Sequence, residues 1–335
     1  MKKKNFIILC VGPMTINTIK SVNLFTKEKK QTINLICSRN QVEANKLGSG
    51  YVSNFSTEKF SKYIKKLNNK YIKLARDHGG PFTSDKRLKN TDLELTRCKK
   101  SFEADIKSGF KTLHIDTSFL GNKKFEYAVN LYKFCQKKSK KLKNKIEYEI
   151  GVNFHGDKFK KEEFNKIITQ FGDLKNVKFI TGTTGSETAE NKQIGKFNFQ
   201  NSKFMVSELH KKGKLLKDHN CDFLNSTTIK LRKKSGIQCF NIGPEVAYVE
   251  NKLLFDFGKK SKNPNFNLFF KIVISNNKWK KWCKNKSSNK IKFLSSAHYF
   301  YYNKNYLRFK REFLDKNNFD DLVIKEQRKI YKKFY

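Results

Sequence analysis

No apolar run in this 335-residue chain reaches the roughly 18 residues that a transmembrane helix needs, so we expect no membrane span. The N-terminus joins three lysines to a short apolar run at residues 6–11, which resembles a weak signal peptide. No small-residue cleavage site follows, because Gly12 and Pro13 come next. We therefore expect a first core strand at this position.

The seven cysteines form no Cys-x-x-Cys pair, and their number is odd. This pattern argues against a disulfide framework and against a zinc knuckle. It suits a reducing compartment, and we expect a cytoplasmic protein.

Acidic residues are scarce: 30 Asp and Glu stand against 72 Lys and Arg, which gives a net charge of +42. Such an excess can signal nucleic-acid binding. The lysines are spread over the whole chain, however, and no RNP-like, KH-like or zinc-finger pattern accompanies them. The abundance of Lys and Asn is typical of an AT-rich genome. We expect no specific nucleic-acid partner, but a general attraction for anionic, phosphorylated ligands.

Short β-rich segments alternate with longer amphipathic ones over the first 260 residues. The predicted strands are residues 6–11, 32–37, 71–75, 112–115, 146–150, 177–181, 215–217 and 237–242. The predicted helices include residues 14–25, 57–67, 92–108, 124–141, 160–171, 202–212 and 226–234. Strands that alternate with helices indicate a parallel sheet, and eight repeats at this length favour a (β/α)8 TIM barrel. A doubly wound open sheet is the alternative.

The pattern changes after Lys259. Residues 261–335 are rich in Phe, Tyr and Lys and contain both tryptophans, Trp279 and Trp282. We expect this part to form a helical or mixed C-terminal extension, packed on a barrel of residues 1–260.

Polar residues gather at the carboxyl ends of the predicted strands, where parallel barrels carry their functional groups. Histidine and carboxylate side chains suit zinc and similar metals. Taken singly, each such residue is more often a turn cap or a structural histidine, so their concentration at one end is the signal. The residues at or near these ends are Arg39, Asn40, Asp77, His78, His114, Asp116, Glu149, His155, Glu187, His219, Asn220, Gly243 and Glu245.

Seven segments resemble, in order and spacing, the Z-type subunit family of class II tagatose-bisphosphate aldolase. The likeness runs from about residue 6 to about residue 258, and each motif alone is weak. The segments are ICSRNQV (36–42), GSGY (48–51), RDHGGP (76–81), SGFKTLHIDTS (108–118), EIG (149–151), DHNCDF (218–223) and NIGPE (241–245).

The resemblance implies a lyase of carbohydrate metabolism, which performs metal-dependent aldol cleavage or epimerisation of a phosphorylated or acidic sugar. In the more distant catalytic class II aldolases, an Asp-His pair follows the third strand. By this likeness, Asp77 would move a proton, and His78 and His219 would bind a divalent metal, expected to be zinc. Asp116 and Glu149 are further candidates for catalysis, with Glu187 or Glu149 as a third ligand.

The expected substrate contacts are Arg39, Asn40, Asn220, Gly243 and Glu245. Two turns could hold a phosphate, at residues 182–186 and at Gly243-Pro244. Pro244 suits the first position of a helix, which would leave N–H groups free for an anion. Either turn could equally be an ordinary βα connection.

The chain departs from the catalytic enzymes after the sixth strand. They carry a further zinc-binding histidine there, whereas residues 183–187 contain none. The Z-type family lacks it too, so the alternative function is a non-catalytic subunit that stabilises a partner aldolase chain. We expect an oligomer in either case. A Schiff-base aldolase would need a lysine of depressed pKa inside the barrel. Lys73 and Lys178 lie in strands, but chance placement explains both.

Overall fold

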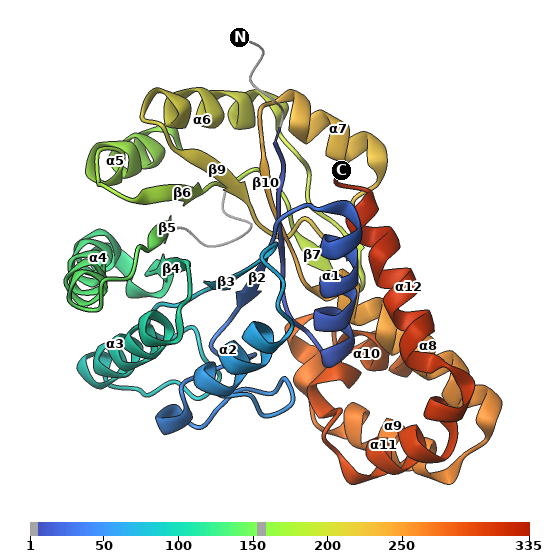
Figure 1. Cartoon of the computed structure of the whole chain (residues 1–335). Coiled ribbons are helices and arrows are strands. Elements are labelled where there is room, and N and C mark those ends of the chain that lie inside the picture. The colour runs from blue at the N-terminus through green and yellow to red at the C-terminus, as the bar shows by residue number, and fades with distance from the viewer. Residues whose placement is uncertain (1–5, 153–158) are drawn as a thin grey trace.

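Eight parallel strands close into a barrel in the computed structural model, which describes residues 6–152 and 159–335 (Figure 1). Their order around the barrel is β1-β10-β9-β6-β5-β4-β3-β2. This closure confirms the predicted TIM barrel and excludes the open sheet. The strands are β1 (Ile8–Val11), β2 (Ile33–Cys37), β3 (Ile72–Arg76), β4 (Thr112–Asp116), β5 (Glu147–Gly151), β6 (Val177–Thr181), β9 (Leu215–Asp218) and β10 (Cys239–Ile242).

A helix follows each barrel strand and packs on the outside. These helices are α1 (Ile16–Lys29), α2 (Thr57–Lys66), α3 (Thr91–Ser108), α4 (Lys124–Lys141), α5 (Lys161–Phe171), α6 (Phe199–Lys211), α7 (Ser226–Lys234) and α8 (Pro244–Ser261). Helix α1 begins two residues later than predicted, because the Thr15 side chain accepts a hydrogen bond from the Thr18 N–H and so caps the helix. Among the described helices, none has the length and apolarity to cross a membrane.

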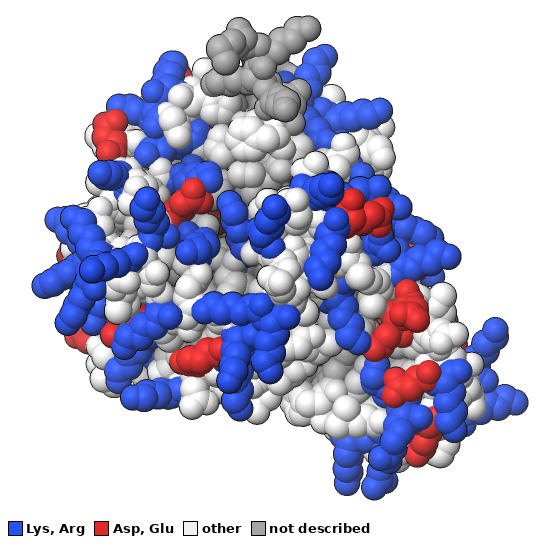
Figure 2. Space-filling model, viewed as in Figure 1, with Lys and Arg blue, Asp and Glu red and all other residues white. Residues whose placement is uncertain are grey.

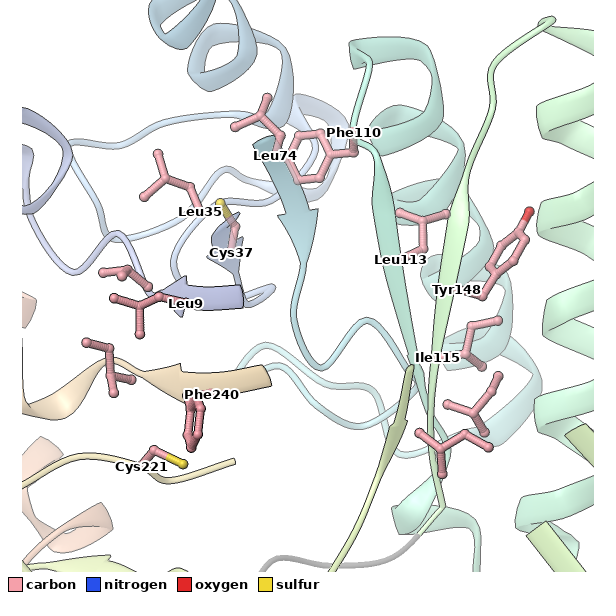
Figure 3. Close-up of a cluster of buried hydrophobic side chains, with 14 of the residues drawn as sticks. Leu9, Leu35, Cys37, Leu74, Phe110, Leu113, Ile115, Tyr148, Cys221 and Phe240 are labelled. Carbon is pink, nitrogen blue, oxygen red and sulfur yellow. The ribbon is translucent and has the colours of Figure 1, made fainter. Parts of the chain in front are cut away.

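Alternation along the strands divides the core into two layers. In β1, Leu9 packs outward against the helices, in the cluster drawn in Figure 3, whereas Cys10 points into the barrel. The inner layer is small and consists of Cys10, Ile36, Ala75, Phe179 and Cys239. It forms an apolar floor below the polar residues at the carboxyl ends of the strands.

A short antiparallel hairpin interrupts the repeat after β6. Its strands, β7 (Thr188–Ala189) and β8 (Lys192–Gln193), have two residues each, too few for a recognisable pattern in the sequence. The hairpin loop reaches the C-terminal extension, because the Glu190 N–H donates to the Trp282 carbonyl over 2.9 Å.

The C-terminal extension is helical and has its own apolar core. It comprises α9 (Pro264–Ser275), α10 (Asn289–Ser296), α11 (Lys304–Phe309) and α12 (Phe319–Lys332), with short 3-10 turns and one π-helical turn between them. Leu254 of α8 already belongs to this second core, so the boundary placed after residue 260 falls at the end of a shared helix. Helix α12 returns along α1 (Figure 1), where the Tyr331 and Ser21 hydroxyls lie 2.8 Å apart.

Candidate active site at the carboxyl end of the barrel

A cavity of about 350 Å³ opens at the carboxyl ends of the strands. This volume is in the range of small-molecule sites, roughly 300 to 1,000 Å³. Of the site residues expected from the sequence, those that line the cavity are Asn40, Asp77, His78, Asp116, His219, Asn220 and Gly243.

Four side chains at this end of the barrel could together hold a metal ion: Asp77, His114, Glu149 and His219. One potential ligand atom from each lies within 4.8 Å of the others. Nε2 of His219 is 2.7 Å from Oε1 of Glu149, and Nδ1 of His114 is 3.4 Å from Oδ1 of Asp77 and 3.5 Å from Oε1 of Glu149. Two imidazoles and two carboxylates in a buried setting suit a divalent ion of the zinc type.

Lys217 supports this group from below. Its side chain is buried and donates a hydrogen bond to Oε2 of Glu149. Burial disfavours the charged form, but Cys10 and Glu149 outweigh it and raise the pKa of Lys217 above its usual range. Lys217 is therefore a permanent ammonium, without the depressed pKa that a Schiff-base lysine needs. Of the two strand lysines noted in the sequence, Lys73 is exposed and Lys178 pairs with Glu147, so neither enters the barrel.

His78 and Asp116 form a pair beside the four-residue group. Nδ1 of His78 lies 2.6 Å from Oδ2 of Asp116, and Nε2 lies 3.7 Å from Oδ2 of Asp77. Burial lowers the pKa of His78, but Asp77 and Asp116 raise it further, to about 9. His78 is thus an imidazolium at neutral pH. Its ring centroid is 5.4 Å from that of His219, so it borders the group while Asp116 engages Nδ1.

The backbone at His78 is unusual. Its φ of 43° lies in the left-handed region, as does the φ of 56° at Asn220, which also lines the cavity. Non-glycine residues in this region carry a cost in free energy and concentrate at functional sites. Both residues with this backbone conformation line the cavity, directly after β3 and β9.

Several residues expected at the site lie elsewhere. Arg39, expected to bind substrate, is buried between Glu43 and Glu94, at 2.7 and 2.9 Å, because its charge needs partners inside the protein. Glu187 is exposed and lies outside the four-residue group. Glu245 is buried and accepts hydrogen bonds from the Phe223 N–H and from Lys333, so it holds the loop rather than a ligand.

His155 lies outside the described residues, and nothing is assigned to it.

The predicted phosphate turn after β10 is already occupied by the protein. The N–H groups of Gly243 and Glu245 both donate to Oδ1 of Asp222, each over 2.8 Å. The Asp222 carboxylate therefore satisfies the start of α8, and the expectation of free N–H groups at this turn is wrong. The expectation failed because Asp222 lies about twenty positions before the helix, and no local sequence pattern links it to the start of α8.

The other predicted phosphate turn, at residues 182–186, is also tied to the protein. The hydroxyls of Thr184 and Ser186 lie 2.6 and 3.1 Å from Oδ1 of Asp218, to which Arg232 is paired. These hydroxyls hold the loop to β9.

His114 was counted among the histidines near the strand ends but was given no role, and Lys217 was not considered, although strand alternation carries a signal for both. In β4, Leu113 and Ile115 pack outward, so His114 points inward with Asp116. In the same way, Lys217 shares the inward side with His219, two residues further on. The period of two identifies the inward side of each strand, but not which inward side chains meet.

No protein-family model matches the sequence, and no curated protein matches it either. Solved structures do share its fold. A probable tagatose 6 phosphate kinase from Sinorhizobium meliloti has a TM-score of 0.77 at 15% identity, over 98% of this chain and 99% of that chain. The fructose-bisphosphate aldolase from Campylobacter jejuni has a TM-score of 0.59 at 14% identity, over 99% of this chain and 90% of that chain.

The YdjI aldolase from Escherichia coli has a TM-score of 0.52 at 14% identity, over 92% of this chain and 91% of that chain. At these identities the likeness shows a common fold. Because the matches extend over nearly the whole chain, the shared fold includes part or all of the C-terminal extension.

Proposed function

We propose that this chain is an aldolase-like enzyme of carbohydrate metabolism, which cleaves a carbon–carbon bond in a phosphorylated or acidic sugar or epimerises it. The observation that carries the proposal is the four-residue group of Asp77, His114, Glu149 and His219, set beside the imidazolium of His78 at one mouth of the barrel. The seven cysteines are free thiols, which supports a cytoplasmic location.

The residues that would hold a divalent metal ion, with zinc as the first candidate, are those same four. When bound there, such an ion supplies Lewis-acid polarisation of a substrate carbonyl. The donor atoms fit the requirement, because two histidine nitrogens and two carboxylate oxygens converge in a buried site that the Lys217 ammonium only partly neutralises.

Asp77 and His78 would move the protons. One oxygen of Asp77 faces His114 within the group, and the other faces Nε2 of His78. A carboxylate with a low pKa beside an imidazolium gives the cavity both a proton acceptor and a proton donor. Asp116 holds the imidazole in place and stabilises its charge, and so acts as a positioning residue.

The test combines metal analysis with a turnover assay. The purified chain should retain close to one divalent ion, and it should release triose phosphate from tagatose 1,6-bisphosphate or fructose 1,6-bisphosphate, or epimerise a sugar acid. D77N should reduce turnover about a hundredfold or more. E187Q is the control, since that exposed side chain lies outside the group.

If the chain holds no metal and turns over none of these substrates, the catalytic proposal is wrong. The alternative implied by the resemblance, a subunit that stabilises a partner aldolase, then makes its own prediction. The chain should raise the activity or melting temperature of a co-purifying aldolase chain.

A further inference from the structure

The C-terminal extension reaches the mouth of the barrel. Lys281, Trp282 and Tyr299 line the same cavity as Asp77 and His78, although about 200 residues separate the two sets in the sequence. The extension therefore forms one wall of the candidate active site.

The barrel loops fix the position of this wall. Nε1 of Trp282 donates to the Tyr299 hydroxyl over 3.1 Å, and the Tyr299 ring meets the Tyr51 ring edge to face, with centroids 4.7 Å apart. The ion pair of Lys278 with Asp85, at 2.7 Å, ties the preceding turn to the loop after β3. With the hairpin contact to the Trp282 carbonyl, three separate loops hold this segment at the mouth.

Lys281 is the one lysine or arginine among the described residues that line the cavity. It has no carboxylate within ion-pair distance in the described part of the chain, whereas its neighbour Lys278 is paired with Asp85. The Lys281 ammonium lies 5.3 Å from the centre of the Trp282 ring, and the residue is exposed. Desolvation at the cavity mouth lowers the pKa of Lys281, and the nearby Asp85 opposes this shift. A ligand can therefore reach this charge without breaking an existing ion pair.

Two other groups expected to receive an anion, Arg39 and the N–H groups at the start of α8, are already engaged. Arg39 is enclosed by two glutamates, and Asp222 occupies the start of α8. Four carboxylates line the cavity, from Asp77, Asp85, Asp116 and Asp222. The imidazolium of His78 is the other cationic side chain of the lining, and it is paired with Asp116. Among the described residues that line the cavity, Lys281 is therefore the cation that can receive an anionic group without giving up a carboxylate partner.

We propose that Lys281 of the C-terminal extension binds the anionic group of the sugar, a phosphate or a carboxylate, while the sugar chain extends toward Asp77 and His78. This inference rests on the proposed function, because it names the residue that binds the anionic group of the same sugar substrate. The extension thereby takes part in substrate recognition in addition to packing on the barrel.

The test uses the full-length chain with K281A, K281R and the matched control K280A. Lys280 is the adjacent lysine, is exposed and does not line the cavity. In the first arm, inorganic phosphate is titrated, and the signal of Trp282 is the part of the tryptophan fluorescence change that is absent from the W282F chain. K281A should weaken the Trp282-linked binding of phosphate about tenfold, whereas K281R and K280A should bind as the wild type does.

In the second arm, the probes are tagatose 6-phosphate, a sugar acid and unphosphorylated tagatose. K281A should raise the KM or Kd for the anionic sugars about tenfold and leave the neutral sugar unchanged. The charged sugar with the larger loss identifies the anion that Lys281 prefers. Unchanged melting temperature of unliganded K281A checks that the fold is intact.

The two arms separate this inference from the proposed function. If K281A and K280A respond alike to phosphate and to the anionic sugars, the role of Lys281 is wrong, even where the wild type turns over sugar. If Lys281-dependent phosphate binding is seen but no sugar is turned over, the anion site stands and the proposed enzyme activity fails.

Discussion

The Lys217 ammonium and the Glu149 carboxylate, 68 residues apart in the sequence, form a buried ion pair inside the barrel. The other oxygen of Glu149 lies 2.7 Å from Nε2 of His219. The Glu149 carboxylate thus contacts the Lys217 ammonium with one oxygen and the candidate metal group, through His219, with the other. The lysine offsets the charge of Glu149 and so limits the negative charge that the group presents to a metal.

Removing this ammonium should therefore leave the buried Glu149 without its ion-pair partner. K217M is expected to lower the free energy of unfolding by about 3 to 5 kcal/mol, because Glu149 loses its ion-pair partner. Urea unfolding in the presence of EDTA measures the effect. The double variant K217M/E149Q should recover most of the loss, since neither charge remains. Equal stability of K217M and the wild type would show that this ion pair does not stabilise the fold.

The candidate metal group makes a separate prediction. H114A and H219A should each lose retained zinc, because either change removes a nitrogen ligand from a set of four. E187Q should retain it, since that residue is exposed and outside the group. Metal analysis after gel filtration gives the ratio of zinc to protein. Equal retention in the wild type and the H114A/H219A double variant would contradict the assignment.

Asp116 should control the protonation of His78. Asp77 is the larger cause of the raised pKa and remains, but D116N removes the negative charge beside Nδ1, so the pKa of His78 should fall from about 9 toward its ordinary value near 6.5. NMR titration of the metal-free protein measures the change. A raised folded-state pKa stabilises the fold fully below pH 6.5 and ceases to do so as the pH rises through about 9. D116N should flatten this part of the stability profile.

A second pH dependence of the free energy of unfolding is expected from Glu250, which lies in α8 where this helix meets the extension. Burial raises the pKa of Glu250 to about 7, against the opposing hydrogen bond from Thr15 and with a further increase from Asp320. An acid whose folded-state pKa is raised favours folding when protonated. Its stabilising effect is full below about pH 4.5 and is lost as the pH rises through 7, by up to about 3 kcal/mol.

E250Q should remove this loss, because the amide stays neutral at every pH. Its unfolding free energy should vary less than that of the wild type between pH 5 and about pH 8. E326Q is the control, since that glutamate is only partly buried on α12 and pairs with a neighbouring lysine. Parallel pH profiles for E250Q and the wild type would show that Glu250 does not titrate in this range.

The alternation of β-rich and amphipathic segments was sufficient to predict a closed barrel. Each strand was placed to within about two residues, because buried strands and capped helices leave local signals. His78, His219, Asn220 and Asp116 were located at the cavity because βα connections begin where polar residues follow an apolar run. The short hairpin at β7 and β8 left no such signal.

The sequence by itself determined the fold and the end of the barrel at which the polar residues gather, since both depend on neighbours along the chain. Tertiary structure alone decided which of these residues meet. Arg39 pairs with two glutamates away from the cavity, and Asp222 accepts hydrogen bonds from the N–H groups at the start of α8. Lys281 of the extension lines the cavity at the barrel mouth. Each outcome brings together segments that are far apart in the sequence. For Arg39 the cause is the need of a buried charge for partners, and a local sequence pattern does not contain such long-range contacts.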